Sequence, residues 1–367
     1  MKFLGAYLIG FLTTVLLLWL LKPLALYIRL VDLPGGRKYH QQPVPLIGGI
    51  AMFGGFLGAV FILPGPLLDG GLALLASLAL VVIFGLWDDY RALSVQTRFA
   101  AQVGAAWIMI HWGDVVLYDL GRLFLPGETV LLGPLAVPFT IFSTVGVINA
   151  MNMADGVDGA AGGMAVLTMF LLALAAPIAT LQESVDTLLL ATSAVLAFLC
   201  FNLCLPWRRK EGASVFMGDA GSTFLGLFLA WFFIKLSQGE QRAFAPVTAL
   251  WIFALPLLDT VTLLIRRVLK GHSPFAADRE HLHHLLLLTG YSVNQTVLIL
   301  WSLSLGLALI GLAGFYFNIP ESVMFYGFLG LSTLYFYEMQ HAWKVMKPTR
   351  YHKPQKQGGV SGGLISR

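Results

Sequence analysis

The sequence contains little charge and little cysteine. Only 11% of its 367 residues are Asp, Glu, Lys or Arg, whereas a soluble globular chain carries about 25%. Hydrophobic residues make up 57% and the mean hydropathy is +0.79, which excludes a soluble globular domain and indicates an integral membrane protein. The 39 glycines and 26 phenylalanines are typical of packed transmembrane helices.

The two cysteines, Cys200 and Cys204, lie four residues apart in an apolar run and are interpreted as packing residues, not a disulfide or a metal pair.

A cleavable signal peptide is not expected, because residues 3–21 are long enough to span a bilayer and lack a small-residue cleavage site. The pI near 9.0 does not indicate nucleic-acid binding, because the basic residues punctuate the apolar runs and form no stripe.

Eleven apolar runs approach the roughly 20 residues of a spanning helix. They cover residues 3–21, 46–63, 70–87, 98–112, 134–151, 160–176, 187–206, 221–235, 243–265, 294–317 and 321–343. The pattern predicts an all-α polytopic integral membrane protein with about 11 transmembrane helices.

Lysine and arginine predict the orientation. If the loops alternate between the two sides, 19 of the 23 basic residues fall on one side, which is expected to be cytoplasmic. The N-terminus is then periplasmic and the C-terminus cytoplasmic. Residues 1–343 are expected to form a single transmembrane catalytic domain with its active-site loops in the cytoplasm, followed by a basic, disordered tail at 344–367.

Acidic residues are rare, yet several stand at the ends of apolar runs on this same side. Asp88 and Asp89 follow one run; their repulsion calls for a nearby cation or donor, although a solvated helix end is an equal alternative. Next come Asn149, Asn152 and Asp155, spaced three apart so that one slowly drifting helical face carries them. Carboxylate and amide oxygens suit a hard cation, while the alternative here is a polar loop with glycine turns.

The third motif is a glycine turn. Phe216 precedes Asp219 by three residues, and the turn opens the next apolar run. A helix N-terminus at this place favours bound phosphate, and Phe216 offers a ring that could stack on a base. The alternative is an ordinary turn in which the aspartate caps a helix.

The fourth motif is the basic loop 266–293. It contains Arg266, Arg267, Arg279 and three histidines, His281, His283 and His284. Zinc is disfavoured because no cysteine accompanies the histidines, so these side chains are interpreted as donors to phosphate oxygens.

Two further features have structural alternatives. Asp259 lies about six residues inside the ninth run, where it is either a partner of the site or a buried structural acid. Lys38 lies in a basic loop, framed by glycines, that precedes the second run. The alternative is that this loop is a simple positive-inside loop.

Together these motifs resemble the polyprenyl-phosphate N-acetylhexosamine-1-phosphate transferase family, in the family's order and over nearly the whole chain from Val31. Members transfer a sugar-1-phosphate from a UDP-sugar to a lipid phosphate at the cytoplasmic face and release UMP. The resemblance implies the following roles: Mg²⁺ ligands Asn152 and Asp219; uracil contacts Phe216 and Asp158; catalytic or acceptor-side acids Asp88, Asp89 and Asp155; substrate contacts Lys38, Asn149, Arg266, Arg267, Arg279, His281, His283 and His284.

Within the family, Leu282 interrupts the histidines, as in the branch that uses UDP-N-acetylglucosamine and starts enterobacterial common antigen, O antigen or teichoic-acid linkage units. The muramoyl-pentapeptide branch has three consecutive histidines. The resemblance implies a Mg²⁺-dependent (Mn²⁺ substituting) UDP-GlcNAc:undecaprenyl-phosphate GlcNAc-1-phosphate transferase of the bacterial inner membrane. Another UDP-N-acetylhexosamine, UDP-MurNAc-pentapeptide and a homodimer stay open.

A rival class is a transporter of an anionic solute. It predicts functional charges near the membrane midplane, whereas the acids here gather at one surface.

The topology is testable by thiol labelling. In a variant without Cys200 and Cys204, cysteines introduced at Ala92 and Gly212 are expected to react with an impermeant reagent only from the cytoplasm, because both lie in basic-side loops. A cysteine at Gly127 is expected to react from outside. Labelling of position 92 from the periplasm would contradict the eleven-span topology.

Overall fold

Helices account for nearly all of the regular structure. The computed structural model describes residues 2–33, 42–62, 71–124, 127–203, 212–273 and 280–349. Within these ranges the paired strands are β1 (Val31–Asp32) and β2 (Val44–Pro45), a short antiparallel ladder. The prediction of an all-α membrane protein is confirmed.

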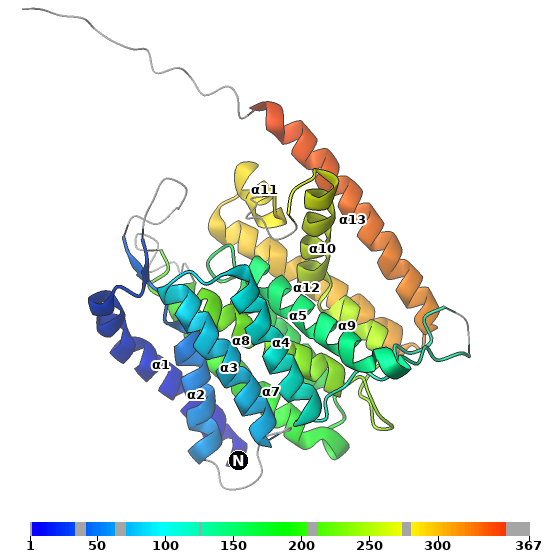
Figure 1. The fold of residues 1–367 in the computed structure, drawn as a ribbon, viewed down its shortest axis with the longest axis horizontal. Coiled ribbons are helices and arrows are strands. Elements are labelled where there is room, and N and C mark those ends of the chain that lie inside the picture. Colours follow the sequence, from blue (N-terminus) through cyan, green and yellow to red (C-terminus); the bar gives the residue numbers. More distant parts are fainter. Residues whose placement is uncertain are drawn as a thin grey trace, which may run out of the picture.

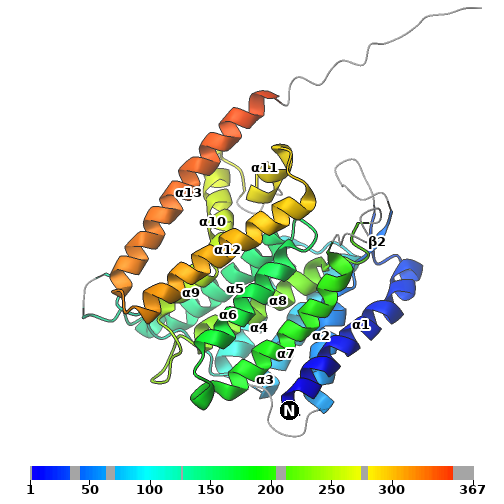
Figure 2. The ribbon, with the colours of Figure 1, turned by 180° about the vertical axis from the view of Figure 1, so that it is seen from behind.

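Thirteen α-helices lie in the described part of the chain. They are α1 (Lys2–Ile28), α2 (Gly48–Ile62), α3 (Gly71–Tyr90), α4 (Val95–His111), α5 (Ala136–Ala154), α6 (Ala160–Ala175), α7 (Ile178–Asn202), α8 (Gly218–Lys235), α9 (Pro246–Ile252), α10 (Ala254–Leu269), α11 (Leu282–Leu288), α12 (Val293–Tyr316) and α13 (Glu321–Thr349), with a 3₁₀ turn at Gly133–Leu135 before α5. Figures 1 and 2 show α1 and α13 at opposite edges of the bundle.

Within the described residues each predicted apolar run is helical, and all but one of the runs form a single helix, but not each helix is long enough to cross a membrane by itself. Among the described residues, five helices meet that test by length and hydropathy: α1, α3, α5 with its 3₁₀ turn, α7 and α12. The pair α9–α10 makes a sixth if it is counted as one broken span. The number of eleven spans and the orientation therefore stay predictions.

The run predicted as one helix at 243–265 is broken, which corrects that prediction. α9 ends at Ile252, α10 begins at Ala254, and the two axes differ by 83°. Pro256 explains the break, because its ring clashes with the carbonyl four residues earlier, that of Ile252, and it has no N–H to donate to it. As a result α10, with α11, projects beyond the bundle at the end away from the N-terminus (Figure 1).

α8 is the central helix of the bundle. All of its residues from 220 to 234 are buried, including Trp231 and Phe228, and it packs against α2, α3 and α5. A helix that is apolar all round is stable only when other helices surround it. The core therefore forms around α8, and the first residues of α8 lie where the neighbouring helices end.

Glycines let the neighbouring helices approach α8 at this end. A Cβ on Gly49 of α2 would lie 2.2 Å from the nitrogen of Gly221, and one on Gly85 of α3 would lie 2.5 Å from the Cα of Ala220. Backbone bonds join the starts of α2 and α8, since Gly48 N donates to Phe216 O at 2.9 Å. The helix ends are thus fixed to one another by backbone contact.

α13 runs along one edge of the molecule and ends far from the N-terminus (Figure 1). It continues to Thr349, so the first residues of the predicted basic tail are helical. Residues 350–367 lie outside the described residues.

The contact of α3 with α8 is testable by adding one methyl group. Gly85→Ala is expected to lower the thermal midpoint of the purified protein, because overpacking costs about 1–3 kcal/mol. Gly146→Ala on α5 is the matched control, since no atom lies within 4 Å of its added Cβ. Equal midpoints for the two variants would contradict the close approach.

Candidate active site

The predicted acids meet where α3 and α5 end and α8 begins. Asn152 on α5 donates from Nδ2 to Asp219 Oδ1 at 2.6 Å and to Ser222 Oγ at 2.9 Å, both on α8. Asp89 on α3 accepts from the backbone of α8. Segments that are far apart in the sequence thus form one polar cluster at one end of the central helix.

Asp89 caps the N-terminus of α8. Its Oδ1 accepts from Asp219 N at 2.7 Å and its Oδ2 from Ala220 N at 3.1 Å. These N–H groups have no partner within the helix, and the positive end of the helix dipole stabilises a carboxylate. Gly218 is required beside it, because its φ is +71° and a Cβ there would lie 2.4 Å from Asp89 Oδ2.

Asp88 points to a different partner. Its Oδ1 accepts from Leu93 N at 2.6 Å, and its Oδ2 lies 3.4 Å from Arg98 Nη1. That Oδ2 is buried and makes no hydrogen bond. Asp219 lies within electrostatic range of both Asp88 and Arg98. Arg98 was not among the predicted site residues; its place four residues into α4 gave no signal in the sequence.

The polar groups spaced three residues apart on α5 contact different neighbouring helices. Asn152 faces α8, whereas Asn149 donates to Gln102 Oε1 on α4 at 2.8 Å. Asp155 follows the last residue of α5, and burial together with the charges of Asp158 and Asp219 raises the pKa of its carboxyl to about 7. Asn149 therefore lies beside the acid cluster, while Asp155 belongs to it electrostatically.

Asn202, at the end of α7, was also missed by the sequence reasoning. Its Oδ1 accepts from Gly159 N at 2.6 Å, and its Nδ2 donates to Val215 O at 3.0 Å. It thereby joins the loop after α5 to the loop before α8. Nothing near Asn202 in the sequence marked it, because its partners are 43 and 13 residues away.

The histidine motif lies over the loop after α5. His283 is 4% exposed, and a Cβ on Gly156 would lie 2.2 Å from its Nε2. Burial and the neighbouring His284 and His281 lower the pKa of His283 to about 3, so its ring is neutral at physiological pH. Its Nε2 is buried without a hydrogen-bond partner. The glycine in the acidic loop thus makes room for the histidine ring.

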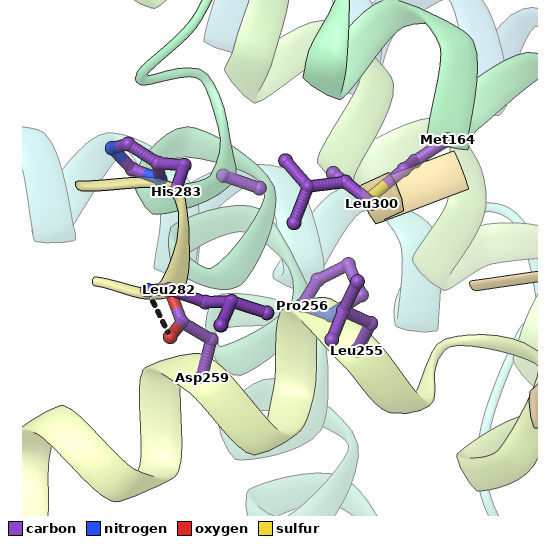
Figure 3. Close-up of a pocket in the computed structure, with 8 residues that line it drawn as sticks. Met164, Leu255, Pro256, Asp259, Leu282, His283 and Leu300 are labelled. Carbon is purple, nitrogen blue, oxygen red and sulfur yellow. Dashed lines mark hydrogen bonds between the residues drawn. The ribbon is translucent and has the colours of Figure 1, made fainter. Parts of the chain in front are cut away.

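Asp259 holds the start of α11. Its Oδ1 accepts from Leu282 N at 3.0 Å, the bond dashed in Figure 3, and its Oδ2 lies 2.7 Å from His281 Nδ1. Beside it is a small pocket with a largely apolar lining that includes Pro256 and His283 (Figure 3). Asp259 therefore contacts the predicted substrate-binding histidines directly.

Buried arginines lie two turns further along α10. Arg266 is 2% exposed; its Nη2 lies 2.5 Å from Glu280 Oε2, while its Nε and Nη1 make no hydrogen bond. Lys270 Nζ reaches the same Glu280 oxygen at 2.5 Å. Arg267 is also buried, at 6% exposed. A guanidinium with buried, unused donors is suited to binding an anion.

The other predicted residues are placed as follows. Phe216 pairs through its backbone, since its N–H donates to Pro45 O at 2.9 Å, and its side chain is partly buried at the same end of α8. Lys38 and Arg279 lie outside the described residues.

The donor set is compatible with a hard divalent cation. The buried carboxylate of Asp88 pairs with Arg98 and lies near Asp219, to which Asn152 is bound through its amide nitrogen. Mg²⁺ prefers oxygen ligands and is usually held by one or two carboxylates plus substrate phosphates, not by a complete protein cage. Among the described residues, no group of three or more His, Cys, Asp or Glu side chains is arranged to hold a metal ion.

Fold and site define a class: an all-α membrane protein with an acidic, oxygen-rich site at one end of its bundle, a buried histidine against the loop after α5, and buried arginines on α10. The model of glycosyl transferase family 4 matches residues 71–237. The chain is also similar over nearly its whole length to undecaprenyl-phosphate alpha-N-acetylglucosaminyl 1-phosphate transferases.

The relative from Escherichia coli K12 is 36% identical over 338 residues, covering 92% of this chain and 91% of the relative. That from Yersinia pestis is 37% identical over 342 residues, covering 92% and 91%. That from Haemophilus influenzae is 36% identical over 345 residues, covering 94% and 96%. The chain therefore belongs to glycosyl transferase family 4, and the resemblance inferred from the motifs is confirmed.

The bridging role of Asn202 gives a stability prediction. Asn202→Ala is expected to lower the free energy of unfolding by about 2–6 kcal/mol, because two buried backbone groups each lose a partner, at about 1–3 kcal/mol per group. Asn202→Asp keeps the acceptor for Gly159 N and loses the donor to Val215 O, so its thermal midpoint should lie between those of wild type and Asn202→Ala. A midpoint for Asn202→Ala equal to that of wild type would disprove the bridge.

Proposed function

We propose that this protein transfers N-acetylglucosamine-1-phosphate from UDP-N-acetylglucosamine to undecaprenyl phosphate, giving undecaprenyl-diphosphate-N-acetylglucosamine and UMP. The observation that carries the proposal is the convergence of Asp88, Asn152 and Asp219 at the start of α8, which brings oxygen donors together as a diphosphate–cation complex requires. The printed names of the relatives, which describe an undecaprenyl-phosphate acceptor and an N-acetylglucosaminyl 1-phosphate group, support it.

The reaction is a phosphoryl transfer in which positioning and charge neutralisation do most of the catalysis. The lipid phosphate oxygen attacks the sugar-bearing phosphorus, the bond from that phosphorus to the UMP oxygen breaks, and UMP leaves. A phosphate monoester has its second pKa near 6, so the acceptor is largely dianionic at pH 7.5 and a general base has little proton to remove. We therefore assign the carboxylates to organising the reactants.

Within this mechanism the chain's acids have different tasks. Asp219, Asn152 and Asp88 would hold Mg²⁺, with Mn²⁺ as a substitute; the bound ion neutralises charge on the diphosphate. Asp89 fixes the start of α8, because both of its oxygens accept backbone N–H groups there. Asp155 lies across the cluster and contributes to the acidic surface that faces the acceptor.

The sugar donor, UDP-N-acetylglucosamine, is proposed to lie between the acid cluster and the histidine motif at the start of α11. Phe216 and Asp158 are assigned to the uracil, with Asn149 beside them, while Arg266, Arg267, His283 and His284 are assigned to phosphate and sugar oxygens. Lys38 and Arg279 are proposed as further phosphate contacts. The buried donors of Arg266 that lack partners support this assignment.

We further propose that the protein crosses the bacterial inner membrane eleven times, with this site on the cytoplasmic face. The projecting α10–α11 arm is at the end of the bundle away from the N-terminus (Figure 1). A UDP-sugar is too highly charged to cross a bilayer unaided, so the site must open to the compartment that contains it, which this proposal takes as the cytoplasm. Residues 1–343 then form one catalytic domain, and 344–367 a basic cytoplasmic tail.

The test is an assay of detergent-purified protein with undecaprenyl phosphate and several UDP-sugars. UMP release is expected with UDP-N-acetylglucosamine, to be lost in EDTA and restored by Mg²⁺ or Mn²⁺. Asp219→Ala is expected to abolish it while the protein stays folded, because the cation loses a carboxylate oxygen.

Glu128→Ala is the control, since Glu128 is an exposed acid in the loop before α5, far from the start of α8. Undiminished turnover in EDTA, or by Asp219→Ala, would sink the metal assignment. Preference for another UDP-sugar would change the proposed donor and keep the reaction class.

A further inference from the structure

Asp259 is the meeting point of three helices. From its place on α10 it accepts from Leu282 N at the start of α11 at 3.0 Å and from Tyr335 Oη on α13 at 2.9 Å, both through Oδ1. Its Oδ2 lies 2.7 Å from His281 Nδ1. Asp259 and Tyr335 were not assigned a role in the proposed reaction, yet they contact the histidine motif from behind.

The direction of the His281 hydrogen bond follows from its partners. A carboxylate that accepts from an amide N–H and a phenol O–H acts as an acceptor only, so the Nδ1 of His281 carries the proton and donates. A hydrogen bond at one ring nitrogen sets the role of the other. Asp259 therefore leaves Nε2 of His281 as the nitrogen available to other groups and fixes the plane of the ring.

A continuous series of contacts leads from this ring to the acid cluster. The rings of His281 and His283 stack with centroids 5.1 Å apart and planes inclined by 13°. His283 in turn lies against Gly156, next to Asp155. The plane of His281 therefore determines where the neutral ring of His283 lies over the acidic loop.

We propose that Asp259 is a positioning residue for the transfer reaction, acting through His281, and that Tyr335 completes its hydrogen-bonding shell. This inference rests on the proposed function. It links the outermost helix, α13, to the site: Tyr335 holds Asp259, Asp259 holds His281, and His281 supports His283. A carboxylate partner on the far nitrogen of a functional histidine orients the ring in the same way in metal sites.

The chain contains a matched structural pair that serves as a control. Asp186 on α7 is 4% exposed and accepts from Tyr7 Oη at 2.9 Å, the same length as the Tyr335–Asp259 bond. Its other oxygen accepts from Gln182 Nε2 at 2.9 Å. Asp186 thus has the burial and tyrosine partner of Asp259 but no histidine, so it reports what loss of such a carboxylate does to stability alone.

The central variant is Asp259→Asn. Its amide oxygen still accepts from Leu282 N and Tyr335 Oη, but its NH₂ group faces His281 Nδ1, which must then become the acceptor. We expect kcat/KM for UDP-N-acetylglucosamine to fall about 10- to 100-fold, the range seen when the carboxylate partner of a metal-binding histidine is removed. Asp186→Asn is expected to keep wild-type kcat/KM. Tyr335→Phe is expected to lower kcat/KM more than Tyr7→Phe.

A double-mutant cycle separates positioning from general stabilisation. In a His281→Gln background, Asp259→Asn is expected to lower kcat/KM by less than about twofold, since the side chain through which it acts is gone. If Asp259→Asn retains wild-type kcat/KM, or loses the full 10- to 100-fold again in the His281→Gln background, the proposal is wrong.

A spectroscopic measurement keeps the test independent of turnover. In ¹⁵N-histidine-labelled protein, with the His281 signals assigned by their loss in His281→Gln, wild type is expected to carry its proton on Nδ1 and Asp259→Asn on Nε2. An unchanged tautomer would overturn the proposal. Failure of wild type to release UMP would instead reject the proposed function and leave this result standing.

Discussion

The hydrogen bonds from the first turn of α8 to the Asp89 carboxylate are the interaction on which the site depends. α8 is buried from Ala220 onward, and its first N–H groups have no acceptor within the helix, so they need one supplied by the protein or by solvent. Asp89 provides both oxygens, and this fixes the end of α3 to the start of α8. Asp219 is one of the residues whose N–H is held, so its carboxylate is placed by the same contact.

The proposed site has two halves of different chemistry. The helix ends of α3, α5 and α8 present carboxylates, and the arm formed by α10 and α11 presents histidines and a buried arginine. Each half is stabilised internally: Asp88 by Arg98, and Arg266 by Glu280. A nucleotide diphosphate in complex with a divalent cation would bring the cation to the acidic half and the anion to the half that contains the arginine. A nucleotide diphosphate exists in solution as such a complex. This arrangement supports the proposal that a divalent cation and a nucleotide diphosphate bind together.

The long apolar runs in the sequence predicted the helices. Because few polar residues interrupt these runs, each of those residues could be considered as a candidate for the site. The sequence therefore predicted Asn152 with Asp219, which the structure brings within 2.6 Å, and the histidine motif. It did not predict Asn202, Gln102, Arg98 or Tyr335. Their partners lie on other helices, and a polar residue near the end of an apolar run has no periodicity to reveal which helix it faces. Pro256 lies within the run predicted as one helix at 243–265, but the break after Ile252 was found only in the structure.

The break between α9 and α10 determines which side chains the second of these helices presents to the site. The axes of α9 and α10 differ by 83°, and Pro256 removes the hydrogen bond that would have continued one helix into the other. α10 buries Asp259 and Arg266 but leaves Val261, Ile265, Val268 and Leu269 exposed. The change of direction therefore yields an arm that carries polar side chains on its inner side and apolar side chains on its outer side.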